Sequence, residues 1–416
     1  MKRLSKLFLV LATAILAFIA VGTSISHADT TREQGVDLSK YQGSTAVFGQ
    51  ASDKFAIVQV GGYYSGSFYP QATYQSQVAS TIAQGKRAHT YIYAQFNSDA
   101  QADEMLNYYL PKVQTPKNSI VALDVESGSP NTEAVMYALA KVKAAGYTPV
   151  LYGYLNFLKA HVDLNTIANS YVLWLAEYPD YNVRTSPDYN YFPSFNNVGV
   201  FQFTSMYKAG GLDGDVDLVG ITYNGYKGTT TNSVGATTVK TTTTTTAIKQ
   251  GQKANATPKS DISVGYTVKV NFSANKWSNG YSIPSWVKGK SYTVQQISGN
   301  KVLLAGILSW IDKSNVEILQ TAKQATSTNT NSSTLPAGVH AQSGYFTPNQ
   351  RLMIWHGAGT NPTYQYYYAG DSIKYVGYID NYSAGYRYIV YKGASGNWCY
   401  VADRHLNPNY MLGYAR

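Results

Sequence analysis

Short apolar runs alternate with helical patterns over the first half of the chain. Six of these runs have strand length and cover residues 55–60, 87–93, 120–125, 149–152, 171–176 and 198–203. Between them, residues 130–145 have the clearest helical period, with Ser129 as the expected N-cap, Pro130 in the first turn and Gly146 after the last. This alternation predicts βαβ units and a largely parallel sheet, either a closed barrel or a doubly wound layer.

The second half of the chain has a different pattern. Residues 229–259 are rich in Thr, Lys and Gln without apolar periodicity, which predicts a flexible linker. A second polar stretch at 321–336 predicts another linker. Short runs of β-forming residues lie between Gly and Asn turns within 260–320 and again within 337–416. We therefore expect an α/β domain over 33–228, followed by two small all-β modules over 260–320 and 337–416.

The first 28 residues have the layout of a secretory signal peptide. Lys2, Arg3 and Lys6 precede an apolar run at 7–21, and Ser26-His27-Ala28 provides a small-x-small cleavage site. The run is short for a membrane-spanning helix, which needs about 20 residues. We expect a secreted, cell-wall-associated protein without a stable membrane anchor after cleavage.

Charge is divided unevenly along the chain. Residues 33–228 carry 12 Lys and Arg against 16 Asp and Glu, whereas residues 229–416 carry 17 against 6. A basic tail predicts adhesion to an anionic partner. For an exported protein we expect anionic wall polymers and not nucleic acid, and we expect a monomer.

Tyrosine dominates the aromatic content, with 38 Tyr among the 416 residues. Only 13% of the residues of the chain are charged. Tyrosine rings cover the apolar faces of sugars, and they also favour β-sheet surfaces, so composition leaves both interpretations open. The single cysteine, Cys399, excludes an intrachain disulfide. No nucleotide-binding glycine motif follows an early strand and no convincing set of zinc ligands or Cys–His pair occurs, so we expect no cofactor and no metal.

A pair of carboxylates ends one apolar run. Asp124 and Glu126 follow the strand pattern IVAL, and residues i and i+2 of a strand point to the same side. The carboxyl ends of parallel strands are where α/β folds place their active sites. Two carboxyl groups sharing a cleft give a protonated acid beside an ionised partner, as glycosidases require.

The pair belongs to an ordered set of motifs near predicted strand ends. These motifs are GVD at 35–37, DVE at 124–126, WLAEY at 174–178, FQF at 201–203 and DVDL at 215–218. The set resembles glycoside hydrolase family 25, the lysozymes that act as N-acetylmuramidases in phage lysins and bacterial autolysins. The resemblance covers about residues 33–228 and implies an irregular, TIM-like β/α barrel. Phe201 stands where the family usually has Trp, and Val60-Gly61-Gly62-Tyr63 departs from the usual turn.

The resemblance implies roles for individual residues. Glu126 matches the general acid, Asp124 its partner carboxylate, Asp37 the aspartate of the opening strand, and Asp217 that of the closing segment. Asp215 is the less favoured match for the closing segment. The expected sugar contacts are Tyr91, Tyr93, Tyr152, Trp174, Tyr178 and Gln202. Barrel packing is the alternative explanation for each of these aromatic residues.

These observations predict a peptidoglycan hydrolase that cleaves the β-1,4 bond between N-acetylmuramic acid and N-acetylglucosamine. The tail blocks resemble bacterial SH3-like wall-binding modules, particularly at residues 283–289 and 308–311. A non-catalytic wall-binding or adhesion protein with a decayed barrel is the alternative, and a wall-lytic amidase or peptidase is a third. The sequence leaves open whether the chain is a phage lysin or a host autolysin. It also leaves open whether Asp124 attacks the sugar or orients the substrate's own N-acetyl group.

Overall fold

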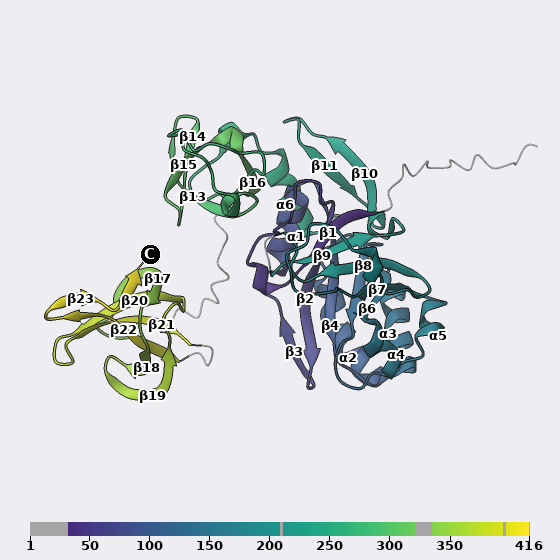
Figure 1. The fold of residues 1–416 in the computed structure, drawn as a ribbon, viewed down its shortest axis with the longest axis horizontal. Helices are drawn as coiled ribbons and strands as arrows, with labels where there is room; N and C mark the ends of the chain where they lie inside the picture. The colour runs from purple at the N-terminus through teal and green to yellow at the C-terminus, as the bar shows by residue number, and fades with distance from the viewer. Residues whose placement is uncertain (1–31, 209–210, 322–334, 394–396, 416) are drawn as a thin grey trace, which may run out of the picture. The chain divides into compact units, whose positions relative to one another are not determined.

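The chain forms two compact units, Met1–Lys323 and Gln324–Arg416. The computed structural model, drawn in Figure 1, describes residues 32–208, 211–321, 335–393 and 397–415. The predicted signal peptide and most of the predicted linker at 321–336 lie outside these ranges. Among the helices described, none has the length and apolar character needed to cross a bilayer.

A closed barrel of eight strands forms the body of the first unit. Its strands are β1 (Glu33–Leu38), β2 (Phe55–Tyr64), β4 (Arg87–Ala94), β5 (Ile120–Asp124), β6 (Thr148–Tyr154), β7 (Val172–Ala176), β8 (Val198–Thr204) and β9 (Asp213–Asp217). They pair in the order β1-β9-β8-β7-β6-β5-β4-β2, and a parallel pairing of β1 with β2 closes the circle. A ninth strand, β3 (Ser67–Pro70), extends β2 as a hairpin. The six predicted strands are all confirmed, with boundaries moved by at most a few residues.

Five helices cover part of the barrel wall. They are α1 (Tyr74–Ala83), α2 (Asp99–Tyr109), α3 (Thr132–Ala144), α4 (Leu155–His161) and α5 (Leu164–Ala168). The predicted helix at 130–145 is therefore confirmed as α3, but its N-cap is Asn131 and not Ser129, because the Asn131 side chain accepts the amide proton of Ala134. In the described residues β7, β8 and β9 follow one another without an intervening α-helix, so the ring of helices is incomplete.

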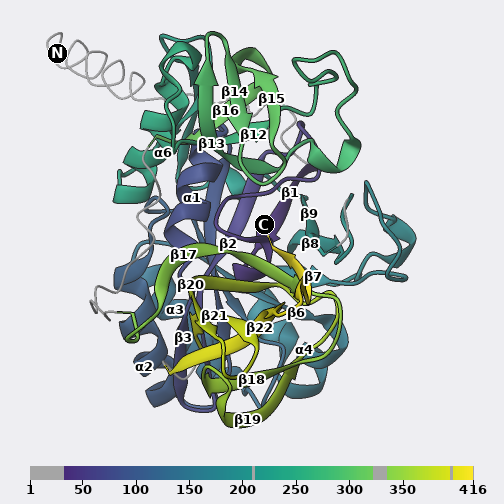
Figure 2. The ribbon, with the colours of Figure 1, turned by 90° about the vertical axis from the view of Figure 1, so that its left-hand side faces the viewer.

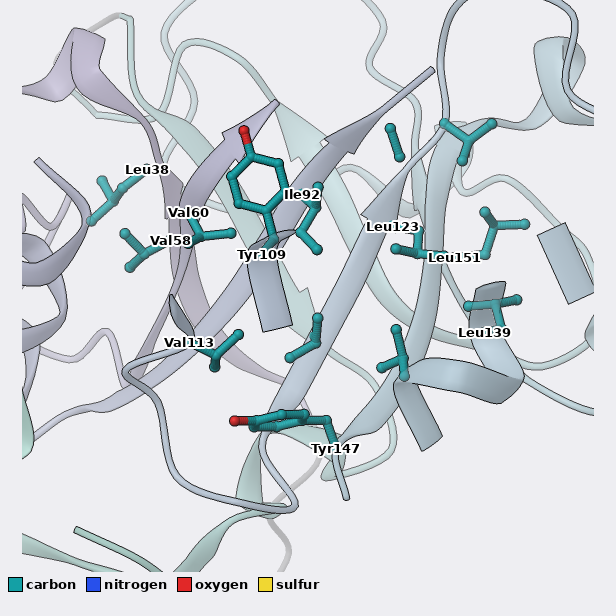
Figure 3. Packing of buried hydrophobic residues seen from close by; sticks show 14 of the residues in the cluster. Leu38, Val58, Val60, Ile92, Tyr109, Val113, Leu123, Leu139, Tyr147 and Leu151 are labelled. Atoms are coloured by element: carbon teal, nitrogen blue, oxygen red, sulfur yellow. The ribbon is translucent and has the colours of Figure 1, made fainter. Parts of the chain in front are cut away.

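Alternation along each strand separates two apolar layers. Val58, Ile92, Leu123 and Leu151 point outward and pack under the helices, as Figure 3 shows. Their neighbours in sequence point into the barrel, where a second cluster contains Ile57, Tyr91, Ala122, Val150, Tyr152, Trp174 and Val200. Asp124 lies on the same face of β5 as Ile120 and Ala122, so its carboxyl group is directed to the barrel interior at the strand end.

Strand β9 runs against the direction of its neighbours. It is antiparallel to both β1 and β8, and its register pairs Asp37 with Asp213 and Glu33 with Asp217. Asp213 therefore lies at the end of the barrel where β1 finishes, and Asp217 lies at the opposite end. A sequence pattern does not reveal strand direction, which is why Asp217 was the wrong choice for the closing aspartate.

Asp217 has a structural task instead. Its Oδ1 accepts the amide protons of Val219 (3.1 Å), Gly220 (2.8 Å) and Ile221 (3.1 Å). Its Oδ2 accepts the amide proton (2.9 Å) and the hydroxyl proton (2.6 Å) of Thr222. This fully buried carboxylate thus satisfies the donors of the turn that leads out of the barrel.

The predicted linker at 229–259 is largely folded. It contains a hairpin of β10 (Tyr226–Thr231) and β11 (Thr237–Thr241), followed by helix α6 (Thr246–Ala256). Figure 2 shows α6 beside α1. Gly251 permits the close approach, since a Cβ there would lie 2.3 Å from the carbonyl oxygen of Ala79.

Threonine hydroxyl groups attach this segment to the barrel. Thr243 Oγ1 accepts the amide proton of Lys117 (2.8 Å), and Thr245 Oγ1 donates to the carbonyl of Gln114 (2.6 Å) while capping α6. The linker prediction was wrong because these side chains replace apolar periodicity with hydrogen bonds to a surface that only the folded barrel provides.

The first all-β module continues directly from α6. A 3-10 turn at Lys259–Asp261 leads to strands β12 (Thr267–Val270), β13 (Ser291–Ser298), β14 (Lys301–Leu304), β15 (Ser309–Asp312) and β16 (Val316–Gln320), which form one antiparallel sheet. Its apolar core includes Ala83 of α1 and Ala254 of α6. Lys269 bridges the two parts, forming an ion pair with Glu317 and donating to Gln84 Oε1 at 2.6 Å. The module is thus packed on the barrel and is not separated from it by the flexible linker expected at 229–259.

The second unit is an antiparallel eight-stranded sheet. It contains β17 (His340–Pro348), β18 (Leu352–Gly357), β19 (Thr360–Tyr367), β20 (Ile373–Asn381), β21 (Tyr386–Lys392), β22 (Trp398–Leu406), β23 (Asn409–Met411) and β24 (Gly413–Ala415). The all-β character expected for residues 337–416 is confirmed over the part of this block that the structure describes. Cys399 and His405 lie six residues apart on the single strand β22, about 20 Å along it at a strand's rise per residue, so they do not form a pair.

We predict that α6 stabilises the barrel. Ile248 is fully buried, so Ile248→Ala should lower the free energy of unfolding of the first unit by about 2–4 kcal/mol. The exposed neighbour Lys249 is the matched control, and Lys249→Ala should change it by less than about 0.5 kcal/mol. Urea unfolding of both variants measures the difference, and equal stabilities would restore the linker interpretation.

We also predict that Asp217→Asn destabilises the barrel. An asparagine keeps one acceptor oxygen and turns an N–H₂ group toward the Thr222 donors, so the variant should lose about 3 kcal/mol. Asp261→Asn, at an exposed position of the first module, should lie within about 0.5 kcal/mol of the wild type. A wild-type urea midpoint for Asp217→Asn would contradict the structural role.

Candidate active site

A cavity of about 200 Å³ opens where the parallel strands of the barrel end. Its wall is formed by Asp37, Tyr91, Asp124, Glu126, Tyr152, Tyr154, Trp174, Tyr178, Gln202 and Asp213. These residues come from strands spread around the barrel or from the segments that directly follow them, so closure of the barrel is what brings them together.

Strand register fixes the order of the wall. Across β4, β5, β6 and β7, Tyr93 is paired with Asp124, Asp124 with Tyr152, and Tyr152 with Trp174. On the other side of the barrel Asp37 is paired with Asp213. Because paired residues point to the same face, all these side chains are directed inward at one level.

Hydrogen bonds hold the wall in one arrangement. The Tyr152 hydroxyl donates to Gln202 Oε1 (2.9 Å), and Gln202 Nε2 donates to Asp37 Oδ2 (2.7 Å). Gln202 therefore fixes both a ring and a carboxyl group. The hydroxyls of Tyr154 and Tyr178 contact each other at the rim.

Aromatic packing supports the same wall. The Trp174 ring lies 4.4 Å from the Tyr152 ring and 6.1 Å from the Tyr91 ring, measured between centroids. Trp174 and Tyr91 meet edge to face, a favourable geometry for aromatic rings. Tyr91, Tyr152 and Trp174 are largely buried, so each of these rings both packs the barrel and lines the cavity.

The cavity concentrates carboxyl groups without a compensating cation. None of its lining residues in the described chain is Lys or Arg. Burial, followed by the charge of Glu126, raises the pKa of Asp124 well above its usual value. Burial also raises the pKa of Glu126, and burial together with the Glu126 charge raises that of Asp213 to about 6. Burial, followed by the charges of Asp213 and Asp215, raises the pKa of Asp37.

Asp124 and Glu126 have different surroundings. Asp124 is 6% exposed, and its Oδ1 has no hydrogen-bond partner in the described part of the chain. Glu126 is more accessible and lines both the cavity and the groove beside it. The pair thus combines a deep carboxyl group with one that can reach a bound molecule, and the raised pKa values favour the protonated form of each group.

Two grooves continue from the cavity. The larger, of about 800 Å³, is bordered by Tyr41, Tyr64, Tyr69 and Tyr93 and shares Tyr91, Asp124 and Glu126 with the cavity. Tyr64 and Tyr69 of the β2–β3 hairpin stack with 3.9 Å between ring centroids. The smaller groove, of about 320 Å³, lies on the other side and is bordered by Tyr154, Tyr178 and Tyr181. An extended polymer with apolar ring faces would fit along this path.

The structure brings most of the predicted site residues together. Asp37, Asp124, Glu126, Tyr91, Tyr152, Trp174, Tyr178 and Gln202 line the cavity, and Tyr93 lines the larger groove. Asp217 is at the far end of the barrel. Sequence reasoning missed Asp213 and Tyr154, and it missed the groove tyrosines at 41, 64, 69 and 181. The alternating aspartates at 213, 215 and 217 were a usable signal for Asp213, but only the direction of β9 selects among them.

No group of three or more His, Cys, Asp or Glu suited to hold a metal ion occurs within the ranges that the structure describes. The four carboxyl groups that line the cavity can act as proton donors, proton acceptors and negative charges.

The similarity to known proteins lies mainly in the barrel. Residues 36–212 match the model of the glycosyl hydrolases family 25. A D-alanyl-L-alanine endopeptidase of Streptococcus phage B30 is 36% identical over 137 residues, which are 31% of this chain and 31% of that protein. A lysozyme of Streptococcus phage Cp-9 is 30% identical over 138 residues, covering 31% of this chain and 39% of that protein. This chain thus spans about a third of the length of these two relatives.

A lysozyme of Lactococcus phage mv1 is 27% identical over 178 residues, covering 39% of this chain and 87% of that protein. Among solved structures, a family 25 glycosyl hydrolase from Bacillus anthracis has 20% identity and a TM-score of 0.33, covering 46% of this chain and 92% of that one. The SH3b domain of lysostaphin has 21% identity and a TM-score of 0.17, covering 19% of this chain and 89% of that one. The match to the family model covers the opening strand, the carboxylate pair and Asp37, all of which meet at the cavity. The barrel of this chain is thus similar to the glycosyl hydrolases family 25, whose model matches residues 36–212.

Proposed function

We propose that this protein hydrolyses the β-1,4 bond between N-acetylmuramic acid and N-acetylglucosamine in bacterial peptidoglycan. The observation that carries the proposal is the Asp124–Glu126 pair, two carboxyl groups at one strand end in a cavity whose burial raises both pKa values. The barrel around them, with helices over part of its wall, is in this proposal a depleted variant of the TIM-like β/α barrel. Relatives named as lysozymes share the matched segment, which supports the same activity here.

Glu126 acts as the general acid in this mechanism. Burial raises its pKa and so favours the protonated form, and its place between cavity and groove gives it access to the glycosidic oxygen. Glu126 donates that proton to the leaving oxygen as the bond to the sugar's anomeric carbon breaks.

Asp124 faces the positive charge that develops on the sugar ring. Asp124 lines the cavity, and in this mechanism its carboxyl group interacts with the anomeric carbon or with the substrate's N-acetyl nitrogen. Both routes give retained configuration, and a sugar ester trapped on Asp124 would select direct attack. Asp37 and Asp213 add negative charge at the same level of the barrel and so favour the oxocarbenium-like transition state.

The aromatic residues provide the surface for the glycan strand. Tyr93 and the stacked Tyr64–Tyr69 pair border the larger groove, and Tyr181 borders the smaller one. Ring faces of this kind cover the apolar C–H faces of pyranoses. The greater volume of the groove beside Glu126 favours more sugar contacts on that side of the cleaved bond.

The alternative functions have less support. A decayed barrel would be expected to lack part of its carboxyl set, whereas this cavity holds Asp37, Asp124, Glu126 and Asp213 together. A thiol peptidase needs a Cys–His pair, and the single cysteine Cys399 is buried and distant along β22 from His405.

Digestion of purified peptidoglycan tests the proposal. The wild type should release fragments that end in reducing N-acetylmuramic acid, identified by mass spectrometry. Glu126→Gln removes the proton donor while preserving shape, so the rate should fall by about 10²- to 10⁴-fold. Reducing N-acetylglucosamine ends, or cleaved peptide bonds, would overturn the bond assignment. A folded Glu126→Gln variant with near-normal activity would remove Glu126 from the acid role.

The tail is proposed to hold the protein at the wall through anionic wall polymers and peptidoglycan itself. Residues 229–323 carry 11 Lys and Arg against 3 Asp and Glu, whereas residues 324–416 carry 6 against 3. Most of the positive charge therefore belongs to the part packed on the barrel. The second unit instead exposes tyrosines, including Tyr364, Tyr382 and Tyr414. We infer that charge attracts the wall and that the second, SH3-like unit supplies contacts that do not depend on charge.

Salt should separate these two contributions. Removing the second unit, in a chain that ends at Gln320, should leave wall binding that added salt abolishes, because screening weakens exposed charge pairs. The full chain should keep a salt-resistant fraction. Both chains should cleave soluble glycan fragments at equal rates. Pull-down with purified walls over a salt series measures the binding, and salt-resistant binding by the shorter chain would contradict this division.

A further inference from the structure

A further buried aspartate, Asp215, lies beneath the cavity. Asp215 of β9 is fully buried and is not part of the cavity wall. Its register partner on β1 is Gly35, two residues before Asp37, so Asp215 occupies the interior layer directly below the Asp37–Asp213 pair. Gly35 has no side chain because a Cβ there would lie 2.5 Å from the carbonyl oxygen of Phe55.

Asp215 contacts two members of the site from below. Its Oδ1 accepts the indole proton of Trp174 at 2.8 Å. Its carboxyl group also neighbours that of Asp37, because Asp37 is paired with Asp213, two residues before Asp215 on the same face of β9. The Oδ2 of Asp215 is buried and has no hydrogen-bond partner in the part of the chain that the structure describes. Two carboxyl groups this close, both shielded from water, cannot both carry a charge at modest cost, so they share one proton.

No positively charged side chain is among the titratable groups that influence Asp37 in the described part of the chain. The charged and titratable groups that face it from neighbouring strands are Asp213 and Asp215 on β9, Asp124 on β5, Tyr91 on β4, Tyr152 on β6 and Tyr178 after β7. Strand β2 pairs Ile57 with Asp37, and β8 contributes the neutral Gln202. Every ionisable group in this set is an acid, so none of them can offset a negative charge on Asp37. A proton shared with Asp215 is what reduces the repulsion there.

We propose that Asp215 is a positioning residue of the glycosidase, which shares a proton with Asp37 and fixes the Trp174 ring at the floor of the cavity. The inference rests on the function proposed above, since Asp37 acts there as a negative charge facing the sugar. Asp215 itself does not touch substrate. It acts through Asp37, whose ionisation it opposes, and through Trp174, whose indole it holds.

Asp215→Asn separates the two effects. The amide oxygen can still accept the Trp174 proton, but the neighbouring negative charge is gone and an N–H group faces Asp37. Asp37 should then ionise at lower pH, because a like charge no longer opposes it, and the acidic limb of the pH–activity curve should move down by about one pH unit or more. The KM for glycan fragments should stay near that of the wild type.

Asp215→Leu is the companion variant. It removes both the shared proton and the acceptor for the indole, so it should produce the same displacement of the acidic limb and, in addition, a several-fold higher KM. A several-fold higher KM for Asp215→Asn as well, with no displacement of the limb, would reduce Asp215 to a packing residue.

A stability measurement tests the shared proton without any reference to activity. A buried acid whose pKa is raised on folding contributes stability below its unfolded pKa, and that contribution is lost as pH rises through the folded value. Asp215→Asn lacks this titration, so its melting temperature in the full-length protein should rise relative to the wild type as pH increases from about 5 to 8. Asp261→Asn, an exposed control, should follow the wild type at every pH.

The outcomes distinguish the two proposals. A wild type without glycan cleavage, combined with a pH-dependent difference in melting temperature for Asp215→Asn, would overturn the proposed function and keep the shared proton. An active wild type with an unchanged acidic limb in Asp215→Asn, and a melting difference that does not vary with pH, would overturn the role of Asp215.

Discussion

The antiparallel pairing of β9 with β1 is the constraint on which this site depends. It closes a barrel whose other strands are parallel. Because β9 runs in the opposite direction, its first aspartate, Asp213, lies at the cavity end and its last, Asp217, lies at the opposite end. One aspartate then faces the cavity, the next lies beneath it and the third caps a turn at the opposite end. Three chemically identical side chains at alternate positions thereby acquire three different tasks.

The cavity has a cost that the rest of the barrel must offset. Several carboxyl groups lie close together with no Lys or Arg in the cavity wall, and burial and mutual repulsion raise their pKa values. This arrangement destabilises the folded chain as pH rises, and it favours the protonated forms of these groups. Stability comes from elsewhere, from the apolar layer between the strands and α1–α3 and from bonds such as those of Asp217. In the function that we propose, the same raised pKa values help the general acid to hold the proton that it donates.

The association of the first all-β module with the barrel changes how the modular organisation is understood. The module shares its apolar core with α1 and α6, and the basic charge of the tail is concentrated in this attached part. A positively charged surface held rigidly beside an acidic barrel differs from one on a flexible tether, because its orientation toward the polymer is fixed. The second unit, by contrast, has separate cores of its own.

The sequence by itself predicted the alternation of strands and helices, the position of the carboxylate pair at a strand end and most of the cavity wall. These features depend on local periodicity, and the motif order carried Asp37, Trp174 and Gln202 to the same site. The all-β character of the tail was also readable from its short runs of β-forming residues. Tertiary structure decided what depends on partners distant in the chain. Strand direction selected Asp213 over Asp217, because antiparallel pairing is a property of two strands and leaves no mark on one. The Thr-rich segment is folded since its hydroxyl groups find acceptors and donors on the barrel, a surface that exists only after the chain has folded.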